Sequence, residues 1–328
     1  MIDLKLRLES PSNNLNQAIS AMSKGILITG ATGKQGGATI DALISSPSHS
    51  SDFTILAVTR NPSSASATAL QNKSPAIKLV TGDLNDVPGI FNAAEAIHKP
   101  IHGVFSVQTF AGQGQNVDTE EKQGKALIDE ALKRGVNHFV YTSVDRGGDK
   151  SLDNPTNIPH FRSKHNIERH LVDSTKGSNM SYTILRPTAF MDNWVPGFMG
   201  KMFGAMWTSA LAPDRKLQLI STKDIGFFAA QAFRNPDRFN NRAVSLAGDE
   251  LTFAEASKVW QDTVGYGAPA TYSFMGAGLI WAVKELGTMF RWFETDGYQV
   301  DIPALKKEHP GLQTLGDWIE KESAFKKQ

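Results

Sequence analysis

The chain has 328 residues, of which 40% are hydrophobic and 20% are charged, and its formal net charge is +1. This composition is typical of a folded globular protein. The balanced charge argues against direct binding of DNA or RNA, which requires a basic surface. Cysteine is absent, so disulfides, thiolate metal sites, iron–sulfur clusters and cysteine nucleophiles are excluded.

No segment predicts a membrane anchor or a secretory signal. The longest apolar run, residues 274–283, is about half the length that a membrane-spanning helix needs. The first residues are polar and charged and contain no apolar stretch of the kind that a signal peptide carries. We therefore expect a protein of the cytoplasm that does not bind a membrane, and leave the nucleus open as a location.

Residues 1–23 are predicted to be a flexible N-terminal extension, because they contain a polar cluster at residues 10–14. From Lys24 onward, short apolar runs alternate with helical patterns. The predicted strands cover residues 25–29, 53–59, 77–80, 103–107, 138–142 and 181–185. The predicted helices cover residues 35–46, 63–72, 86–97, 118–134 and 160–173. Apolar strands that alternate with helices indicate an α/β fold, a doubly wound parallel (Rossmann) sheet.

Beyond Pro187 the pattern is less regular. We expect helices at residues 222–234, 252–264 and 275–293 and a strand at 243–246. No long linker precedes this part of the chain. Residues 24–190 are therefore predicted to form a cofactor domain. Residues 191–328 are predicted to form a smaller C-terminal α/β subdomain for a substrate or partner, with segments that interleave with the core.

A glycine-rich turn, residues 30–36 (GATGKQG), is the clearest local motif. It follows a predicted strand and opens a predicted helix, which is the context of a dinucleotide-binding turn. Gly30 permits the tight turn, Gly33 lets the backbone approach a pyrophosphate, and Gly36 lets the helix pack close to the strand. The free N–H groups of the helix N-terminus attract an anion. The alternative is a structural turn without a ligand.

Arg60 stands at the end of the second strand, where a site specific for NAD carries an acidic residue. A guanidinium can bind a 2′-phosphate through two hydrogen bonds, so the sequence predicts NADP(H). The alternative is a solvated surface arginine. Asp83, at the end of the third strand, can accept a hydrogen bond from an adenine amino group and can equally cap the next helix, since the two roles are not exclusive.

Several short motifs occur in a fixed order along the chain. They are GATGKQG at 30–36, TRNP at 59–62, GDL at 82–84, LRPTAFMDN at 185–193, DIG at 224–226, NPDRF at 235–239 and HP at 309–310. From about residue 24 to about residue 322, this ordered set resembles the NmrA-like group of atypical short-chain dehydrogenases/reductases. The resemblance implies an NADP(H) site.

By position in the family motifs, Thr32, Gly33, Lys34 and Gln35 would line the pyrophosphate. Arg60 would meet the 2′-phosphate, and Asp83 and Leu84 the adenine. Val107 and Gln108 would lie near the nicotinamide ribose. The residues implied to flank the nicotinamide are Thr142, Ser143, Pro187, Thr188, Ala189 and Phe190.

Typical reductases of the superfamily use a Tyr-x-x-x-Lys motif, and the matching residues here are His160 and Lys164. Histidine can act as a general acid near neutral pH. Some relatives that resemble isoflavone reductases use the lysine, so Lys164 is predicted to be catalytic or to bind the cofactor ribose. The alternatives are an exposed helix lysine and, for His160, a surface or capping group. His160, His165 and His170 recur every five residues and share no helix face, so no metal site is expected.

The C-terminal part is rich in aromatic residues and methionine, which suit a flat, apolar ligand such as a quinone. These residues are Phe190, Trp194, Phe198, Met199, Phe203, Met206, Trp207, Phe274, Trp281, Phe290, Trp292 and Phe293. Core packing and a protein-binding face are the alternatives.

Two functional hypotheses follow. The chain is an NADPH-dependent reductase of a carbonyl, quinone or enone, or a non-catalytic NADP(H) sensor that regulates a transcription factor or another protein. The oligomeric state is left open.

Overall fold

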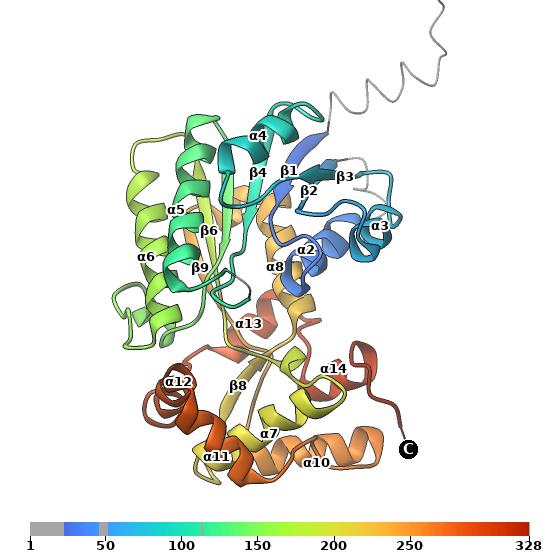
Figure 1. The fold of residues 1–328 in the computed structure, drawn as a ribbon, viewed down its shortest axis with the longest axis vertical. Coiled ribbons are helices and arrows are strands. Elements are labelled where there is room, and N and C mark those ends of the chain that lie inside the picture. Colours follow the sequence, from blue (N-terminus) through green and yellow to red (C-terminus); the bar gives the residue numbers. More distant parts are fainter. Residues whose placement is uncertain (1–22, 46–51, 113, 328) are drawn as a thin grey trace, which may run out of the picture.

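The structure is a computed structural model that describes residues 23–45, 52–112 and 114–327 (Figure 1). Apart from Ser23, the predicted N-terminal extension lies outside these ranges. Among the described residues, no helix combines the length and the apolar character needed to cross a bilayer.

The larger sheet consists of parallel strands in the order β3-β2-β1-β4-β5-β6-β9. Its strands are β1 (Lys24–Ile28), β2 (Phe53–Thr59), β3 (Ile77–Thr81), β4 (Ile101–Ser106), β5 (His138–Thr142), β6 (Ser181–Pro187) and β9 (Arg242–Leu246). The strand order reverses between β1 and β4, and in such sheets a ligand binds at the carboxyl ends of the strands beside this reversal. The predicted doubly wound parallel sheet is confirmed.

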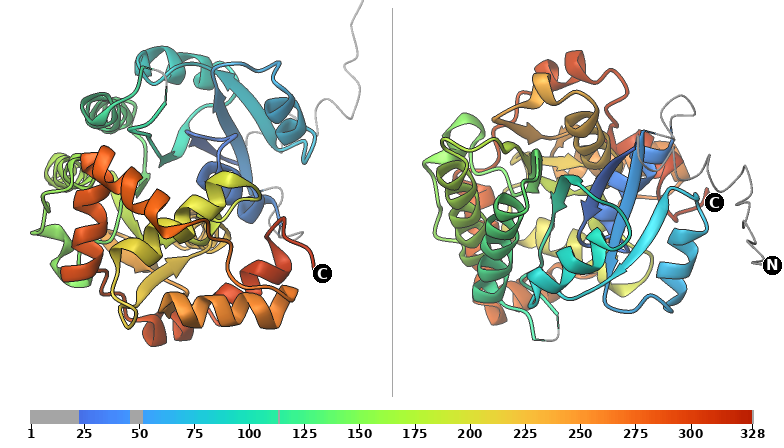
Figure 2. Two further views of the ribbon diagram at one scale, coloured as in Figure 1. Left: turned by 60° about the horizontal axis from the view of Figure 1, so that its bottom comes forward. Right: turned by 90° about the horizontal axis from the view of Figure 1, so that it is seen from above.

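Helices cover both faces of this sheet (Figure 2). Its helices are α2 (Lys34–Ile44), α3 (Ala65–Gln71), α4 (Val87–Glu95), α5 (Val117–Lys133), α6 (Pro159–Ser174) and α8 (Thr222–Arg234). Helices α2 and α8 share one core with the sheet, and α4, α5 and α6 share the other. The boundaries predicted for the strands and helices up to β6 agree with the structure to within one or two residues.

A second, three-stranded sheet lies beside the first, in the order β10-β8-β7. Its strands are β7 (Ala189–Phe190), β8 (Leu217–Ile220) and β10 (Asp249–Leu251). The helices around it are α7 (Phe198–Ala210), α10 (Phe253–Val264), α11 (Ser273–Ala282), α12 (Lys284–Thr295) and α14 (Leu315–Lys321). The sequence did not predict this sheet. The single helix expected at residues 275–293 is also wrong, because α11 ends at Ala282 and α12 begins at Lys284.

The chain passes between the two sheets more than once. It leaves the large sheet at Pro187 and enters the small sheet at Ala189. Helix α8 and strand β9 then return to the large sheet before β10. At one contact between α8 and α2, a Cβ on Gly226 would lie 2.4 Å from the backbone of Ala38, so the helices can approach this closely only with glycine there. The short helices α9 (Pro236–Phe239) and α13 (Ile302–Glu308) complete the connections.

Candidate functional site

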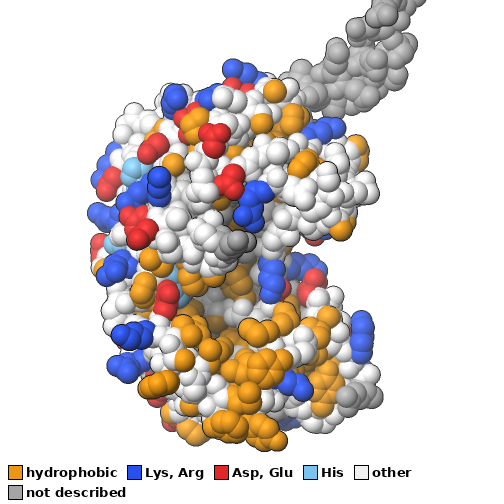
Figure 3. Space-filling model, viewed as in Figure 1, with side chains coloured by type: hydrophobic (Ala, Val, Ile, Leu, Met, Phe, Trp, Pro, Cys, Tyr) orange, Lys and Arg blue, Asp and Glu red, His pale blue; other side chains and the backbone are white. Residues whose placement is uncertain are grey.

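A cleft of about 850 Å³ lies at the carboxyl ends of β1 to β4. The space-filling view shows the molecule hollowed between the part with the large sheet and the part with α7 and α11 (Figure 3). The residues that line the cleft are Thr29, Gly30, Thr32, Gly33, Lys34, Gln35, Gly36, Val58, Thr59, Arg60, Asn61, Ser64, Gly82, Asp83, Leu84, Val107, Gln108, Thr109, Ala111, Gly112, Gln115, Gln123 and Phe190. The structure therefore brings together residues from motifs that lie far apart in the sequence.

The glycine turn forms the floor of the cleft. Gly30 has a φ of +58°, and the N–H of Gly33 donates to the carbonyl of Gly30 at 2.9 Å. A Cβ on Gly36 would lie 2.3 Å from that same carbonyl oxygen, so a larger residue cannot be accommodated without a shift of the backbone. Helix α2 starts after Gly33 with no side-chain cap and no acidic residue in its first turn. Its first N–H groups are therefore available to an anion in the cleft.

Two polar side chains of the turn, Lys34 and Gln35, bind to other parts of the fold. Gln35 Oε1 accepts a hydrogen bond of 2.6 Å from Thr142 Oγ1 at the end of β5. Lys34 Nζ donates to the backbone carbonyl of Asp192, which lies beyond β7. Lys34 thus places a positive charge beside the N-terminus of α2 and links the turn to the smaller sheet.

One end of the cleft carries Arg60, Asp83 and Leu84. Arg60 is exposed and, within the described ranges, has no acidic partner. Asp83 Oδ1 accepts from the N–H of Asn85 at 2.8 Å, whereas Asp86 is the residue that caps α4. The prediction that Asp83 caps this helix is therefore wrong.

The other end of the cleft carries Val107, Gln108 and Phe190. Thr29 Oγ1 accepts from the N–H of Val107 at 2.9 Å and donates to its carbonyl at 3.1 Å, which joins the ends of β1 and β4. Gln108 is 7% exposed, and its Nε2 donates to Ser106 Oγ at 2.9 Å. Its Oε1 is buried and has no partner among the residues that the structure describes. A ligand with a hydroxyl or amide donor could satisfy this oxygen.

Comparison with known proteins agrees with this architecture. The model of the NmrA-like family matches residues 22–319. The chain belongs to the NmrA-like family. An NmrA-like family domain-containing oxidoreductase of Aspergillus hancockii is 26% identical over 259 residues, which are 75% of this chain and 74% of the relative.

Two solved structures show the same fold. One is NmrA, a negative transcriptional regulator, in complex with NAD, with 17% identity and a TM-score of 0.67 over 92% of this chain and 96% of the other. The second is the NADPH-dependent quinone oxidoreductase QOR2 of Escherichia coli in complex with NADPH. It has 22% identity and a TM-score of 0.67 over 90% of this chain and 98% of the other. The NmrA-like fold therefore occurs both in a regulator and in a reductase.

Six residues predicted to bind or flank the cofactor are not among those that line the cleft: Thr142, Ser143, Lys164, Pro187, Thr188 and Ala189. The predicted catalytic residue His160 does not line it either. Lys164 Nζ lies 2.8 Å from Glu120 Oε1 on α5, and Glu120 is fully buried. Ser163 Oγ donates to the other oxygen of the same carboxylate. Lys164 thus has a structural partner in this NmrA-like chain, and its catalytic and ribose-binding roles stay predictions.

His160 lies at the start of α6 and has a carboxylate partner that the sequence did not indicate. Its Nδ1 lies 2.6 Å from Glu285 Oε1 on α12, and its backbone N–H donates to the same oxygen at 3.1 Å. The ring stacks on Phe110 with 4.3 Å between centroids. Burial lowers the pKa of His160, and the hydrogen bond with Glu285 opposes this effect.

The aromatic and methionine residues predicted for the substrate side differ in exposure, and Met206 and Phe190 are partly buried. For Trp194, Phe203, Trp207, Phe290, Trp292 and Phe293 the core-packing alternative holds, because all of them are buried. Others are exposed on α7 and α11, and Figure 3 shows hydrophobic side chains gathered over this part of the molecule. The exposed members are Phe198, Met199, Phe274 and Trp281, with exposed fractions from 56% to 86%. Phe190 alone of the whole set lines the cleft.

Some lining residues were missed by the sequence analysis. Thr59 and Asn61 flank Arg60 in a motif that it did identify, so their position offered a signal. Gln123 comes from the middle of α5 and donates to Asn85 Oδ1 at 3.0 Å. Nothing in the local pattern distinguishes Gln123 from an ordinary helix residue.

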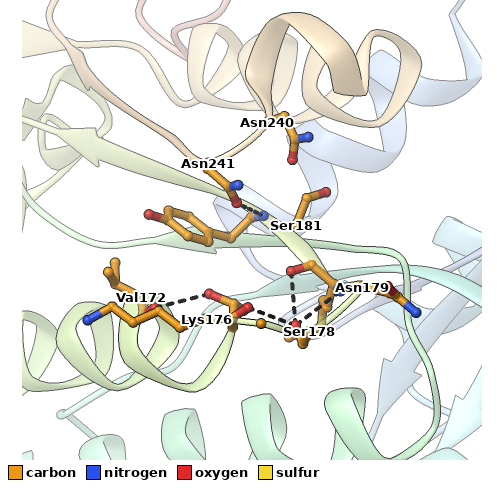
Figure 4. A pocket seen from close by; sticks show the side chains of 11 residues that line it. Val172, Lys176, Ser178, Asn179, Ser181, Asn240 and Asn241 are labelled. Atoms are coloured by element: carbon orange, nitrogen blue, oxygen red, sulfur yellow. Dashed lines mark hydrogen bonds between the residues drawn. The ribbon is translucent and has the colours of Figure 1, made fainter.

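A second cavity of about 400 Å³ lies at the amino-terminal ends of β6 and β9 (Figure 4). There Asn241 Oδ1 accepts from the N–H of Tyr182 at 3.3 Å, and Ser178 Oγ donates to the carbonyl of Thr175 at 2.9 Å. Its one cationic side chain, Lys176, lies just beyond helix α6 and pairs with Asp173 near the end of that helix. Since ligands of parallel sheets bind at the opposite ends of the strands, this cavity is not a candidate for the active site.

Proposed function

We propose that this chain is an NADP(H)-dependent oxidoreductase that reduces a flat, apolar carbonyl, quinone or enone. The observation that carries the proposal is the cleft itself. Among the described residues, it combines an uncapped helix N-terminus at a glycine turn, an arginine at one end and an unpartnered amide oxygen at the other. NADPH, when bound, supplies a hydride. The similarity to a quinone oxidoreductase in complex with NADPH supports this choice of chemistry.

The residues of the cleft fit the parts of such a cofactor. The N–H groups at the start of α2, together with Lys34, would neutralise a pyrophosphate. Arg60 would bind a 2′-phosphate, because its guanidinium has no competing acid in the part of the chain that is described. Gln108 Oε1 would accept a hydrogen bond from a ribose hydroxyl or a carboxamide, and Phe190 would contact the nicotinamide ring.

Cofactor choice is tested by titrating NADPH and NADH into the wild-type protein and the Arg60→Gln variant. A charge-assisted bond contributes about 1.5–3 kcal/mol, and because Arg60 is exposed we expect the lower end, about a tenfold loss of NADPH affinity. NADH affinity should not change. Arg169→Gln, which removes an arginine outside the cleft, is the matched control. Equal losses for both cofactors, or no loss, would contradict the assignment of Arg60.

Reductase activity is tested by following the loss of NADPH absorbance with quinones, enones and aromatic ketones. Turnover of at least one class supports the proposal. NADPH that binds without turnover on any of these substrates would favour the second candidate function.

The second candidate is a non-catalytic NADP(H) sensor that regulates a transcription factor or another protein. Its specific support is the exposed apolar surface of α7 and α11, which includes Phe274 at 71% and Trp281 at 86% exposure. Exposed apolar patches of this kind often bind proteins. A sensor requires that a partner bind the NADPH and NADP⁺ forms with different affinities, which a pull-down with each form would measure.

A further inference from the structure

We propose that Glu285 positions His160 as the proton donor of the reductase. A carboxylate–imidazole pair then performs the task that a tyrosine performs in typical relatives. This inference rests on the proposed function and identifies the residue pair that completes it. The pair joins helix α6 of the large sheet with helix α12 of the smaller part of the protein.

The contacts of Glu285 fix the imidazole in one orientation. A single carboxylate oxygen, Oε1, accepts from the backbone N–H of His160 at 3.1 Å and contacts the ring Nδ1 at 2.6 Å. A carboxylate at Nδ1 requires the proton on that nitrogen, and it stabilises the imidazolium. Nε2 is then the nitrogen through which the ring can exchange a proton with a substrate.

His160 does not itself line the cleft, and its aromatic neighbour Phe110 connects it to the segment that does. Phe110 stacks on the imidazole with 15° between the ring planes, and Phe161 meets it edge-on at 4.8 Å between centroids. Thr109 and Ala111, which flank Phe110, both line the cleft. The side chain of His160 is 10% exposed, so its ring is held by its neighbours and is still accessible.

The charged groups around His160 come from each helix packed against it. They are Glu285 of α12, Lys164 of its own helix and Glu120 of α5. Lys164 is paired with Glu120 at 2.8 Å. Burial and Lys164 lower the pKa of His160, and the two carboxylates raise it. Burial is the largest of these effects, so the pKa of His160 is lowered overall. A lowered pKa makes the imidazolium a stronger acid toward the substrate oxygen and reduces the fraction of His160 that is protonated at neutral pH.

The proposed reduction transfers one hydride and one proton to the substrate. The substrate carbon accepts a hydride from NADPH, which becomes NADP⁺, and the substrate oxygen accepts a proton from Nε2 of the protonated His160. The imidazole is left neutral and regains its proton from water. Glu285 remains ionised throughout and takes no part in the bond changes.

The test compares the pH dependence of kcat and KM for wild type, His160→Gln, Glu285→Gln and Glu294→Gln. Glu294 is the matched control, because it lies on the same helix and accepts from the backbone N–H of Ala212 at 3.0 Å. We expect kcat to fall about 100-fold in His160→Gln and about tenfold in Glu285→Gln at pH 7, with KM unchanged. In Glu285→Gln the imidazolium has lost its anionic partner. The pH above which activity declines should therefore be lower than in the wild type. Glu294→Gln should match the wild type.

A second readout does not depend on turnover. NMR titration of the imidazole, assigned by its absence in His160→Gln, should show a lower pKa for His160 in Glu285→Gln than in the wild type. If both the pH profile and this pKa are unchanged in Glu285→Gln, the proposal is wrong.

If Glu285→Gln does not fold, Glu285→Asp replaces it. This variant keeps the charge, and we expect it to retain the wild-type pH profile with a reduced kcat, whereas a shifted profile would overturn the proposal. Failure of the wild type to reduce any substrate would instead refute the proposed reductase, and the titration would still report whether the two side chains are coupled.

Discussion

Replacing Lys164 with methionine is expected to destabilise the protein, whatever Lys164 does in catalysis. Its partner Glu120 is fully buried and holds two donors, Lys164 Nζ at 2.8 Å and Ser163 Oγ. Methionine keeps most of the length of the side chain and removes the charge. The substitution therefore leaves a buried carboxylate without its counter-charge.

The size of the effect follows from the burial of the pair. Removing one partner of a buried ion pair costs roughly 3–5 kcal/mol. Ser163 retains its hydrogen bond to the carboxylate and Lys164 is 14% exposed, so we expect the lower end, about 3 kcal/mol. Adding Glu120→Gln should restore most of this loss, because the double variant contains neither charge.

Urea unfolding followed by far-UV circular dichroism measures these differences. Lys125→Met is the matched control, since Lys125 pairs with Glu121 on the same helix at 2.6 Å but both side chains are partly exposed. Such a pair contributes less than about 1 kcal/mol. The reasoning is refuted if Lys164→Met is as stable as Lys125→Met, or if the double variant is no more stable than Lys164→Met. Turnover should accordingly be compared in the double variant, where stability and chemistry are separated.

Three further predictions concern the turn, the sheet and the cleft. Gly36→Ala should abolish NADPH binding, because its Cβ would lie 2.3 Å from the Gly30 carbonyl, whereas Gly37→Ala, with its nearest neighbour at 3.6 Å, should bind normally in the same titration. His138 has its pKa lowered to about 4 by burial, so the unfolded chain binds a proton near pH 6.5 that the folded protein excludes. Because of this residue, the free energy of unfolding should be about 2 kcal/mol lower at pH 5 than above pH 6.5. Urea unfolding of His138→Gln should show a smaller loss over the same pH range. Gln108→Leu should weaken NADPH and NADH binding by the same factor, roughly fivefold, and a selective effect on one cofactor would contradict the role given to its Oε1.

The large sheet could be predicted from the sequence because its strands and helices each repeat a clear local pattern. Each of its first strands contains a short apolar run, as in β1, and its longest helix, α5, has 17 residues with an apolar face. The three-stranded sheet could not, because β7 has two residues and β10 has three, too few for an alternation to be recognised. Helix α11 is apolar on every side and only Gly276 in it is buried, so its sequence gave no sign of where it ends.

The same contrast holds within the cleft. The glycine turn and the TRNP motif are each a continuous stretch of sequence, and each acts mainly through its own backbone or a single side chain. Their place in the cleft could therefore be predicted from the sequence. The partners of the predicted catalytic residues come from elsewhere. Glu285 lies 125 residues from His160, and Glu120 lies 44 residues from Lys164. No local pattern links such residues, because only the packing of α5, α6 and α12 brings them together.

These distant contacts determine which variant can distinguish a reductase from a sensor. Lys164 neutralises the charge of the buried Glu120, so the fold needs it in a reductase and in a sensor alike. Its presence therefore does not indicate catalysis. The hydrogen bond of His160 to Glu285 could also be made by a permanently neutral amide side chain, so this bond alone does not require an imidazole. Only an imidazole can also change its protonation state near neutral pH. The behaviour of His160→Gln is therefore decisive: a variant that keeps the stability and cofactor affinity of the wild type but loses its turnover indicates a reductase, whereas the single Lys164 variant loses stability as well.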